Sequence, residues 1–313
     1  MNEGQIKTNP VLEELVKHVK SGDCILFLGA GVHAPPPNDS QYKYPEDQRV
    51  PLGRELSQNL AAEFKYNKEF CEHSCENLQK GPLDCDHSCE NLQRVALYID
   101  YKQGLGRNTL VGALDKYLRK NKKPSPALKM FSSMPFKIFV TTNYDRLLES
   151  ALIKYEKDPA CLVYNPNPNT RTPVESEDPS MERPLLFKMH GDLNQPSSIV
   201  ITDEDYITFV QRMSDKDELH PVPETVRYRM QRWRTLFVGY SLRDFNLRLM
   251  FRTLRWKLDK SDFPPSFAVD KNPDPLTLEV WQNERRFITF VAQDLWTFAP
   301  WLYKEVHGKE YTE

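Results

Sequence analysis

Short apolar runs separated by stretches of helical periodicity are the feature of this sequence that most constrains its fold. Most of these runs are apolar at both odd and even positions, which is typical of strands buried on both faces of a parallel sheet. We therefore predict an α/β fold, with a Rossmann-like, mostly parallel sheet flanked by helices. The predicted strands are residues 24–28, 136–141, 185–189, 235–238, 266–269 and 286–291.

The domain organisation follows from the spacing of these strands. We expect one domain, residues 1–313, built around the sheet. Residues 53–134 read almost wholly as helices between the first two strands, and we interpret them as an inserted helical module. Residues 165–184 are rich in Pro and Asn and are expected to form an exposed loop.

Charge and hydropathy narrow the functional classes. The 42 basic residues nearly cancel the 44 acidic ones, so no global field favours nucleic acid or a membrane surface. No stretch reaches the roughly 18 consecutive apolar residues of a membrane span, and the first residues lack the apolar core of a signal peptide. We therefore expect a cytoplasmic protein with no membrane contact.

The first predicted strand runs into a glycine-rich turn, Gly29-x-Gly31-x-x-Ala34. This spacing fits a dinucleotide-binding turn, in which glycines let backbone amides approach a pyrophosphate. Such a turn is also common as plain structural punctuation. Prolines at 35–37 stand where a Rossmann helix should begin, and no acidic residue ends a clear second strand about 20 residues on. Hydride transfer is therefore the weaker interpretation.

Polar clusters follow three more predicted strands, at residues 141–145 (TTNYD), 189–192 (MHGD) and 239–244 (GYSLRD). Because the carboxyl ends of parallel strands meet at one edge of the sheet, we expect these clusters to form one ligand site. The carboxylate of Asp145 has a second interpretation, because it also suits the start of the following helix.

In this order, the GAG turn, the TTNYD segment, the HGD and the GYS turn resemble the sirtuin-like superfamily. The closest resemblance is to its bacterial NAD-hydrolysing branch in antiviral defence. The resemblance implies a fold that binds NAD, with Asn143, His190 and Asp145 as catalytic residues near the nicotinamide ribose. The other NAD-binding residues that it implies are Gly29, Ala30, Gly31, Thr142, Gly239, Ser241 and Asp244.

The reaction that this resemblance implies is cleavage of NAD as a substrate, by an NAD glycohydrolase. Deacylating sirtuins carry a four-cysteine zinc module soon after the catalytic histidine, whereas here no cysteine lies between His190 and the GYS turn. In such hydrolysis an amide such as Asn143 can orient the water, and His190 can accept a proton from the ribose or from the water. Two alternatives stay open: a module that senses NAD or ADP-ribose without cutting it, and an NAD-dependent oxidoreductase.

An internal repeat lies within the predicted module, at residues 71–93, with CEHSCENLQ followed by CDHSCENLQ. Four of its side chains would suit tetrahedral zinc, although a tandem duplication without metal is the favoured interpretation because no CxxC spacing is present. The residues concerned are Cys71, His73, Cys75, Cys85, His87 and Cys89.

Partners are suggested by a basic helix and by the resemblance. Arg248, Arg252 and Arg255 share one predicted helix face, which we interpret as solvated, with nucleic acid or an acidic protein as the alternative occupant. The resemblance implies a homo-oligomer that works with a HerA-like ATPase or another defence partner. Nucleic acid would then be engaged only indirectly.

Overall fold

The computed structural model describes residues 10–66, 88–102, 104–167, 169–170, 178–213, 215, 219–240, 242, 264–282 and 288–312. Within these residues, a seven-stranded sheet has the order β3-β4-β2-β1-β5-β6-β7, and every neighbouring pair is parallel. This confirms the predicted α/β fold. The strands are β1 (Cys24–Leu28), β2 (Ile138–Thr141), β3 (Ala160–Val163), β4 (Leu185–Lys188), β5 (Arg234–Val238), β6 (Ser266–Val269) and β7 (Ile288–Val291).

Six of these strands fall within or next to the predicted ranges, and β3 is the one that the sequence did not reveal. It lies at the edge of the sheet and pairs only with β4 among the described strands. Cys161 in this strand is exposed, so the segment lacks the continuous apolar run that marks the central strands. An edge strand is covered on fewer sides, and this weakens its sequence signal.

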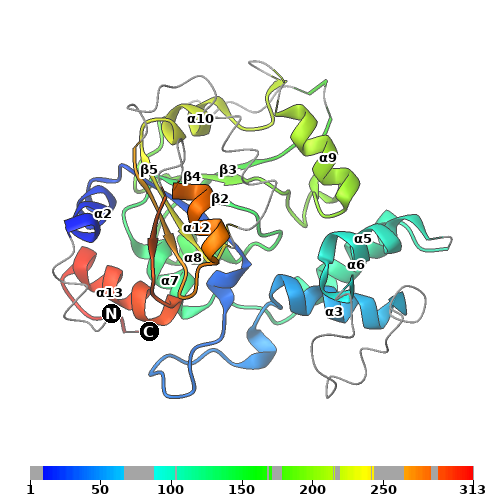
Figure 1. Cartoon of the computed structure of the whole chain (residues 1–313), viewed down its shortest axis with the longest axis horizontal. Coiled ribbons are helices and arrows are strands. Elements are labelled where there is room, and N and C mark those ends of the chain that lie inside the picture. The colour runs from blue at the N-terminus through cyan, green and yellow to red at the C-terminus, as the bar shows by residue number, and fades with distance from the viewer. Residues whose placement is uncertain are drawn as a thin grey trace.

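Helices cover both faces of the sheet (Figure 1). In β1, Leu26 and Leu28 face one side and pack in a core with α2 (Pro10–Ser21), α7 (Pro126–Ser133), α8 (Leu147–Lys154) and α13 (Leu295–His307). Ile25 and Phe27 face the other side, with α9 (Asp203–Arg212), α10 (Glu224–Met230) and α12 (Pro275–Gln282). Because side chains alternate along a strand, each strand contributes residues to two separate cores, one on each face of the sheet.

Beside the sheet, α3 (Gly53–Glu63), α5 (Leu92–Tyr101) and α6 (Arg107–Leu118) pack on one another and form a projecting group (Figure 1). Helix α7 also lies within 53–134, but it packs against α8 and α13. Arg107 ties the projecting group to α9 through an ion pair of 2.8 Å with Asp205. No helix among the described residues is long and apolar enough to cross a membrane.

The register brings four strand ends to one edge. Leu28 pairs with Thr141 and Val238, and Thr141 pairs with Lys188, so the loops that follow these residues start side by side. The order of the strands also reverses here, because β2, β4 and β3 lie on one side of β1 and β5 to β7 lie on the other. This is the position at which open α/β sheets bind ligands.

Candidate active site

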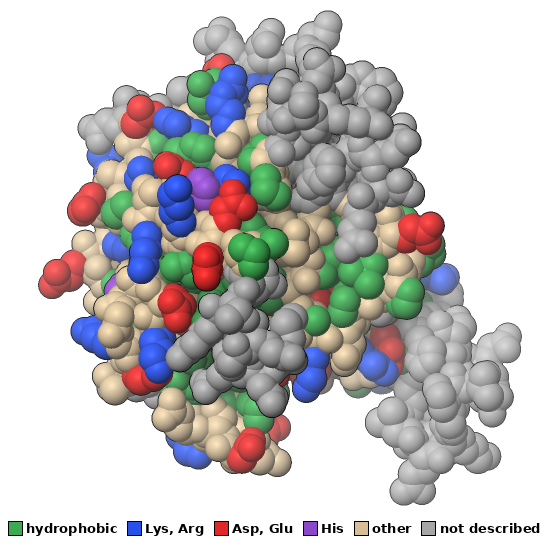
Figure 2. Space-filling view, turned by 60° about the vertical axis from the view of Figure 1, so that its left-hand side comes forward, with side chains coloured by type: hydrophobic (Ala, Val, Ile, Leu, Met, Phe, Trp, Pro, Cys, Tyr) green, Lys and Arg blue, Asp and Glu red, His purple; other side chains and the backbone are tan. Residues whose placement is uncertain are grey.

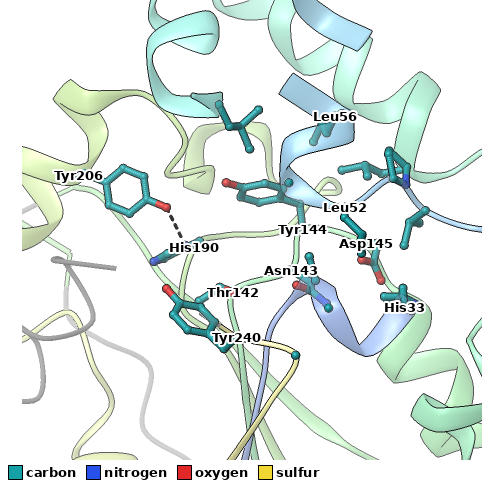
Figure 3. Close-up of a pocket in the computed structure, with 18 residues that line it drawn as sticks. His33, Leu52, Leu56, Thr142, Asn143, Tyr144, Asp145, His190, Tyr206 and Tyr240 are labelled. Carbon is teal, nitrogen blue, oxygen red and sulfur yellow. Dashed lines mark hydrogen bonds between the residues drawn. The ribbon is translucent and has the colours of Figure 1, made fainter. Parts of the chain in front are cut away.

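A cavity of about 350 Å³ opens at this edge, between the strand ends and the projecting group of α3, α5 and α6 (Figure 3). The sheet side contributes polar groups from the loops that follow β1, β2, β4 and β5. The opposite side is apolar. It is formed by Leu52 just before α3, Leu56 in α3, Leu92 in α5 and Leu118 in α6. A mostly apolar cavity with a few convergent polar groups is the usual form of a small-molecule site.

Three glycines lock the loops after β1 and β5 together. A Cβ on Gly239, where φ is +66°, would lie 2.1 Å from the amide nitrogen of Val32, and one on Gly29 would lie 2.4 Å from the Gly239 carbonyl oxygen. Gly31 N–H donates to that carbonyl at 2.8 Å, and Gly29 N–H donates to the carbonyl of Val238 at 3.0 Å. Close packing of two turns therefore requires these glycines, and it already engages both of the amides that were expected to face a phosphate.

The loop after β2 is shaped by Thr141. Its hydroxyl donates to the carbonyl of Leu28 at 3.1 Å and accepts from Asn143 N–H at 3.1 Å. This turn places Thr142 and Asn143 in the pocket wall. Within the described part of the chain, no hydrogen bond engages the side-chain amide of Asn143, which is half-buried against the cavity (Figure 3).

Asp145 contacts the start of α8 and also lies in the cavity wall. Its Oδ1 accepts from the amide of Leu147, the first residue of α8, at 2.9 Å, as expected of a residue that starts a helix. The same side chain lines the cavity and is buried. The helix itself begins at Leu147, two residues after Asp145.

A buried lysine fixes the two polar loops relative to each other. Lys188 is fully buried at the end of β4, and its Nζ donates to Asp192 at 2.6 Å and to Glu149 at 3.3 Å. It also donates to the backbone carbonyls of Tyr144 and Asp145. Charges paired this way are stable only with good geometry, so the cluster holds the TTNYD and HGD loops in a defined position.

His190 is held in place by two aromatic side chains of α9. The imidazole is buried and packs edge-on against Tyr206 and Phe209, with ring centroids 5.1 and 5.7 Å away. Its Nδ1 lies 3.3 Å from the hydroxyl of Tyr206 (Figure 3). Tyr206, which the sequence analysis missed, therefore sets the orientation of the predicted catalytic histidine.

A second histidine in the cavity wall was also missed. His33 follows the glycine turn, is almost fully buried and lines the cavity close to Asp145 (Figure 3). Burial lowers the pKa of this imidazole, and the nearby Asp145 carboxylate opposes that effect only in part. A lone histidine in a turn carries no sequence signal that distinguishes a pocket residue from a core residue.

The structure thus brings Ala30, Gly31, Thr142, Asn143, Asp145, His190 and Gly239 into one cavity. Gly29 packs against Gly239 and is not among the residues that line it. Ser241 and Asp244 lie outside the described residues, as do the three arginines at 248, 252 and 255.

The cysteine and histidine repeat is described only from residue 88 onward. Cys89 is buried, and its carbonyl accepts from the Ser57 hydroxyl at 2.8 Å, whereas the other five predicted ligands lie outside the described residues. Among the residues that are described, no group of three or more His, Cys, Asp or Glu side chains is placed to hold a metal ion.

Comparisons with known proteins show what the chain is similar to. Residues 137–289 match the family model of the SIR2-like domain. The chain is 29% identical to the NAD(+) hydrolase ThsA of Enterococcus faecium over 44% of its own length and 26% of that protein. It is 23% identical to the ThsA of Acinetobacter baumannii over 78% of its length and 42% of that protein.

A third relative is Defense-associated sirtuin 2 of Bacillus subtilis, which is 24% identical over 57% of this chain and 17% of that protein. The chain therefore spans less than half the length of each of these curated relatives. The SIR2-like match covers β2, β4 and β5, and with them Thr142, Asn143, Asp145, His190 and Gly239 of the cavity.

Proposed function

We propose that this protein hydrolyses NAD, cutting the bond between nicotinamide and its ribose to release nicotinamide and ADP-ribose. The observation that carries this proposal is the presence of Asn143 and His190 in one cavity, within a segment that matches a SIR2-like domain. Two relatives named NAD(+) hydrolase ThsA support it. A cavity of about 350 Å³ is large enough for the nicotinamide riboside end of the substrate.

The chemistry needs few groups. Nicotinamide leaves as a neutral molecule while positive charge develops on the ribose, as in glycoside hydrolysis. The Asn143 amide, which has no hydrogen-bond partner in the described part of the chain, orients the attacking water. His190 accepts a proton from that water or from the ribose through Nε2, while its Nδ1 stays beside the Tyr206 hydroxyl.

The rest of the nucleotide extends from this cavity along the loops after β1 and β5. Ala30, Gly31 and Gly239 line its nearer part. We assign Ser241 and Asp244, which follow Gly239 in sequence, to the phosphates and the adenosine ribose. Asp145 contributes its second carboxylate oxygen to the nicotinamide end of the cavity.

The experiment is to incubate the purified protein with NAD, alone and with the product of the neighbouring gene, and to follow nicotinamide and ADP-ribose by chromatography. Equal amounts of both products are expected. NAD that stays intact while binding tightly would instead establish the sensor alternative. A change in absorbance of the nicotinamide ring without free nicotinamide would establish an oxidoreductase.

We further propose that NAD depletion serves antiphage defence, in a homo-oligomer that acts with a HerA-like ATPase or another defence partner. The similarity to Defense-associated sirtuin 2 of Bacillus subtilis supports the defence role. An enzyme that empties the NAD pool must be restrained until it is triggered, and assembly with a partner supplies that restraint. A monomer with full activity that does not depend on concentration or partner would contradict this proposal.

A further inference from the structure

A buried nitrogen in the cavity wall lacks the hydrogen bond that its burial calls for. His33 is 1% exposed at the end of a short 3-10 helix, Ala30–His33, and its ring lines the cavity. Its Nε2 has no hydrogen-bond partner among the described residues. A buried polar atom left unpaired costs about 1–3 kcal/mol, so such an atom in a ligand cavity points to a group that a ligand supplies.

The hydrogen bonds of Tyr44 determine which His33 nitrogen carries the proton. The Tyr44 hydroxyl has one proton to donate. Its oxygen lies 2.8 Å from the carbonyl oxygen of Lys123, which can only accept a hydrogen bond. It also lies 3.3 Å from His33 Nδ1. Because the hydroxyl proton goes to Lys123, Nδ1 must be the donor in the second bond, and Nε2 is left with a bare lone pair.

The imidazole is neutral in this setting. Burial lowers its pKa, and this effect outweighs the opposing influence of Asp145. The cavity wall therefore contains an unpaired acceptor nitrogen on His33, whose side chain lies beside the Asp145 carboxylate, which is also an acceptor (Figure 3). Two neighbouring acceptors cannot satisfy each other, whereas a ligand group with N–H or O–H hydrogens satisfies them.

We propose that His33 is a specificity-determining residue that accepts a hydrogen bond from a neutral donor group of the nucleotide and rejects an anion at the same place. This rests on the proposed function, since it requires NAD or its products in the cavity. NAD offers three kinds of neutral donor: the carboxamide of nicotinamide, the ribose hydroxyls and the amine of adenine. The first two belong to the nicotinamide riboside end, which we place in this cavity. Tyr44, which is not among the residues lining the cavity, is a positioning residue that fixes the His33 tautomer.

The first test measures binding of nicotinamide, nicotinate and ADP-ribose by calorimetry. Wild-type protein is expected to prefer nicotinamide to nicotinate, because a carboxylate offers the acceptors no hydrogen. His33→Phe should lower the affinity for ligands that donate a hydrogen bond to this residue about 10- to 100-fold. If nicotinamide loses affinity, the carboxamide is the donor. If only ADP-ribose does, the donor is one of its ribose hydroxyls or its adenine amine. His18→Phe, which alters a half-buried imidazole outside this cavity, is the matched control and should change neither affinity.

Tyr44→Phe gives a sharper result. It leaves the His33 ring in place but removes the hydroxyl that keeps the imidazole proton on Nδ1. Nε2 can then carry the proton, and the preference for nicotinamide over nicotinate should shrink or reverse. The nitrogen resonances of ¹⁵N-labelled histidine report this directly: Nδ1–H is expected for His33 in the wild type, with a shift toward Nε2–H in Tyr44→Phe.

The outcomes separate this inference from the proposed function. Wild-type protein that hydrolyses NAD but carries the His33 proton on Nε2, or a His33→Phe variant that binds nicotinamide and ADP-ribose as tightly as the wild type does, would overturn the acceptor site alone. Wild-type protein that neither cleaves NAD nor binds any of the three ligands would overturn both.

Discussion

The two edges of the parallel sheet carry similar residue types in different surroundings. At the carboxyl edge, His33 and His190 are buried and Asn143 is half-buried around the cavity described above. At the amino edge, a second cavity of about 480 Å³ is lined by basic side chains such as Lys137 and Arg229. Both edges therefore have a cavity with polar side chains, but only the one at the carboxyl edge has the features of an active site.

The difference lies in how the charges are held. Arg229 meets Asp178 at 3.3 Å, but that carboxylate is 88% exposed, and Lys137 lies 3.9 Å from the half-exposed Asp23. Figure 2 shows a similar pattern over α2 and α13, where basic and acidic side chains are interspersed on the surface. Solvated ion pairs of this kind contribute little to stability and do not hold their side chains in one position. Charge around a hollow is thus a poor guide to function, whereas burial with fixed hydrogen bonds is a good one.

The largest contrast between the edges is expected in activity. Asn143→Ala and His190→Ala should each lower NAD hydrolysis about 10²- to 10⁴-fold, because each removes a group positioned at the reacting centre. Arg229→Ala at the amino edge should leave turnover unchanged. Nicotinamide release is measured with folding checked by circular dichroism. More than a tenth of wild-type turnover in either carboxyl-edge variant would show that its residue has been given the wrong role.

The next contrast is in stability and compares two lysines at strand ends. Lys188→Met leaves Asp192 buried without its cation and leaves Glu149 with Arg146 alone, so it should lower the free energy of unfolding by about 3–5 kcal/mol. Lys137→Met breaks only a partly solvated pair and should cost about 1 kcal/mol or less. Urea denaturation of both variants measures this, and equal losses would remove the distinction between the edges.

A glycine pair separates backbone strain from packing. Gly239 at the carboxyl edge and Gly22 at the amino edge have φ of +66° and +72°, so alanine at either costs about 1–2 kcal/mol from conformation. At Gly239 the new Cβ also meets backbone at 2.1 Å, which adds about 1–3 kcal/mol. At Gly22 the nearest atom is the movable Lys137 Cε at 2.7 Å. Gly239→Ala should therefore melt at the lower temperature, and the reverse order would argue against the interlocked turns.

The smallest contrast concerns pH. The pKa of His33 is lowered by burial, and that of His18, in α2, is lowered by burial and by Arg234. A depressed histidine gives stability that is complete above its unfolded pKa of about 6.5 and is lost as the pH falls below it. One proton contributes at most about 1.4 kcal/mol per pH unit.

We expect His33→Phe to flatten the loss of stability between pH 7 and pH 5 more than His18→Phe does, because His33 is the more buried ring. Thermal melts across this range measure the slopes. Parallel slopes in the two variants would show that burial at the carboxyl edge has no effect on protonation.

Much of the fold could be predicted because the central strands carry their own signal. The strand Cys24–Leu28 is apolar at every position, and its predicted bounds are those observed. The residues that follow β2 and β4 could be placed at one edge because parallel strands end together. The start of α8 and the edge strand β3 were harder to predict, because a local turn and partial exposure blur the periodicity there.

The site shows the same limit. Asn143 and His190 could be chosen from the sequence because each stands in a polar cluster after a strand, in a motif that carries the family resemblance, whereas Tyr206 could not. Its hydroxyl reaches His190 from a helix 16 residues away, and only the packing of α9 on the sheet brings the two together.

The sequence by itself therefore determined which segments are strands, which polar residues stand at their ends, and that those residues share one edge. The tertiary structure decided what each group does there. The glycines serve the contact between two turns, Lys188 pairs with carboxylates from another element, and the proton of His33 is fixed by a carbonyl 79 residues from Tyr44. The two kinds of information differ in the sequence distance that they span. Hydrophobic periodicity is read within one helix or strand, whereas hydrogen bonds and burial depend on residues that come together only on folding.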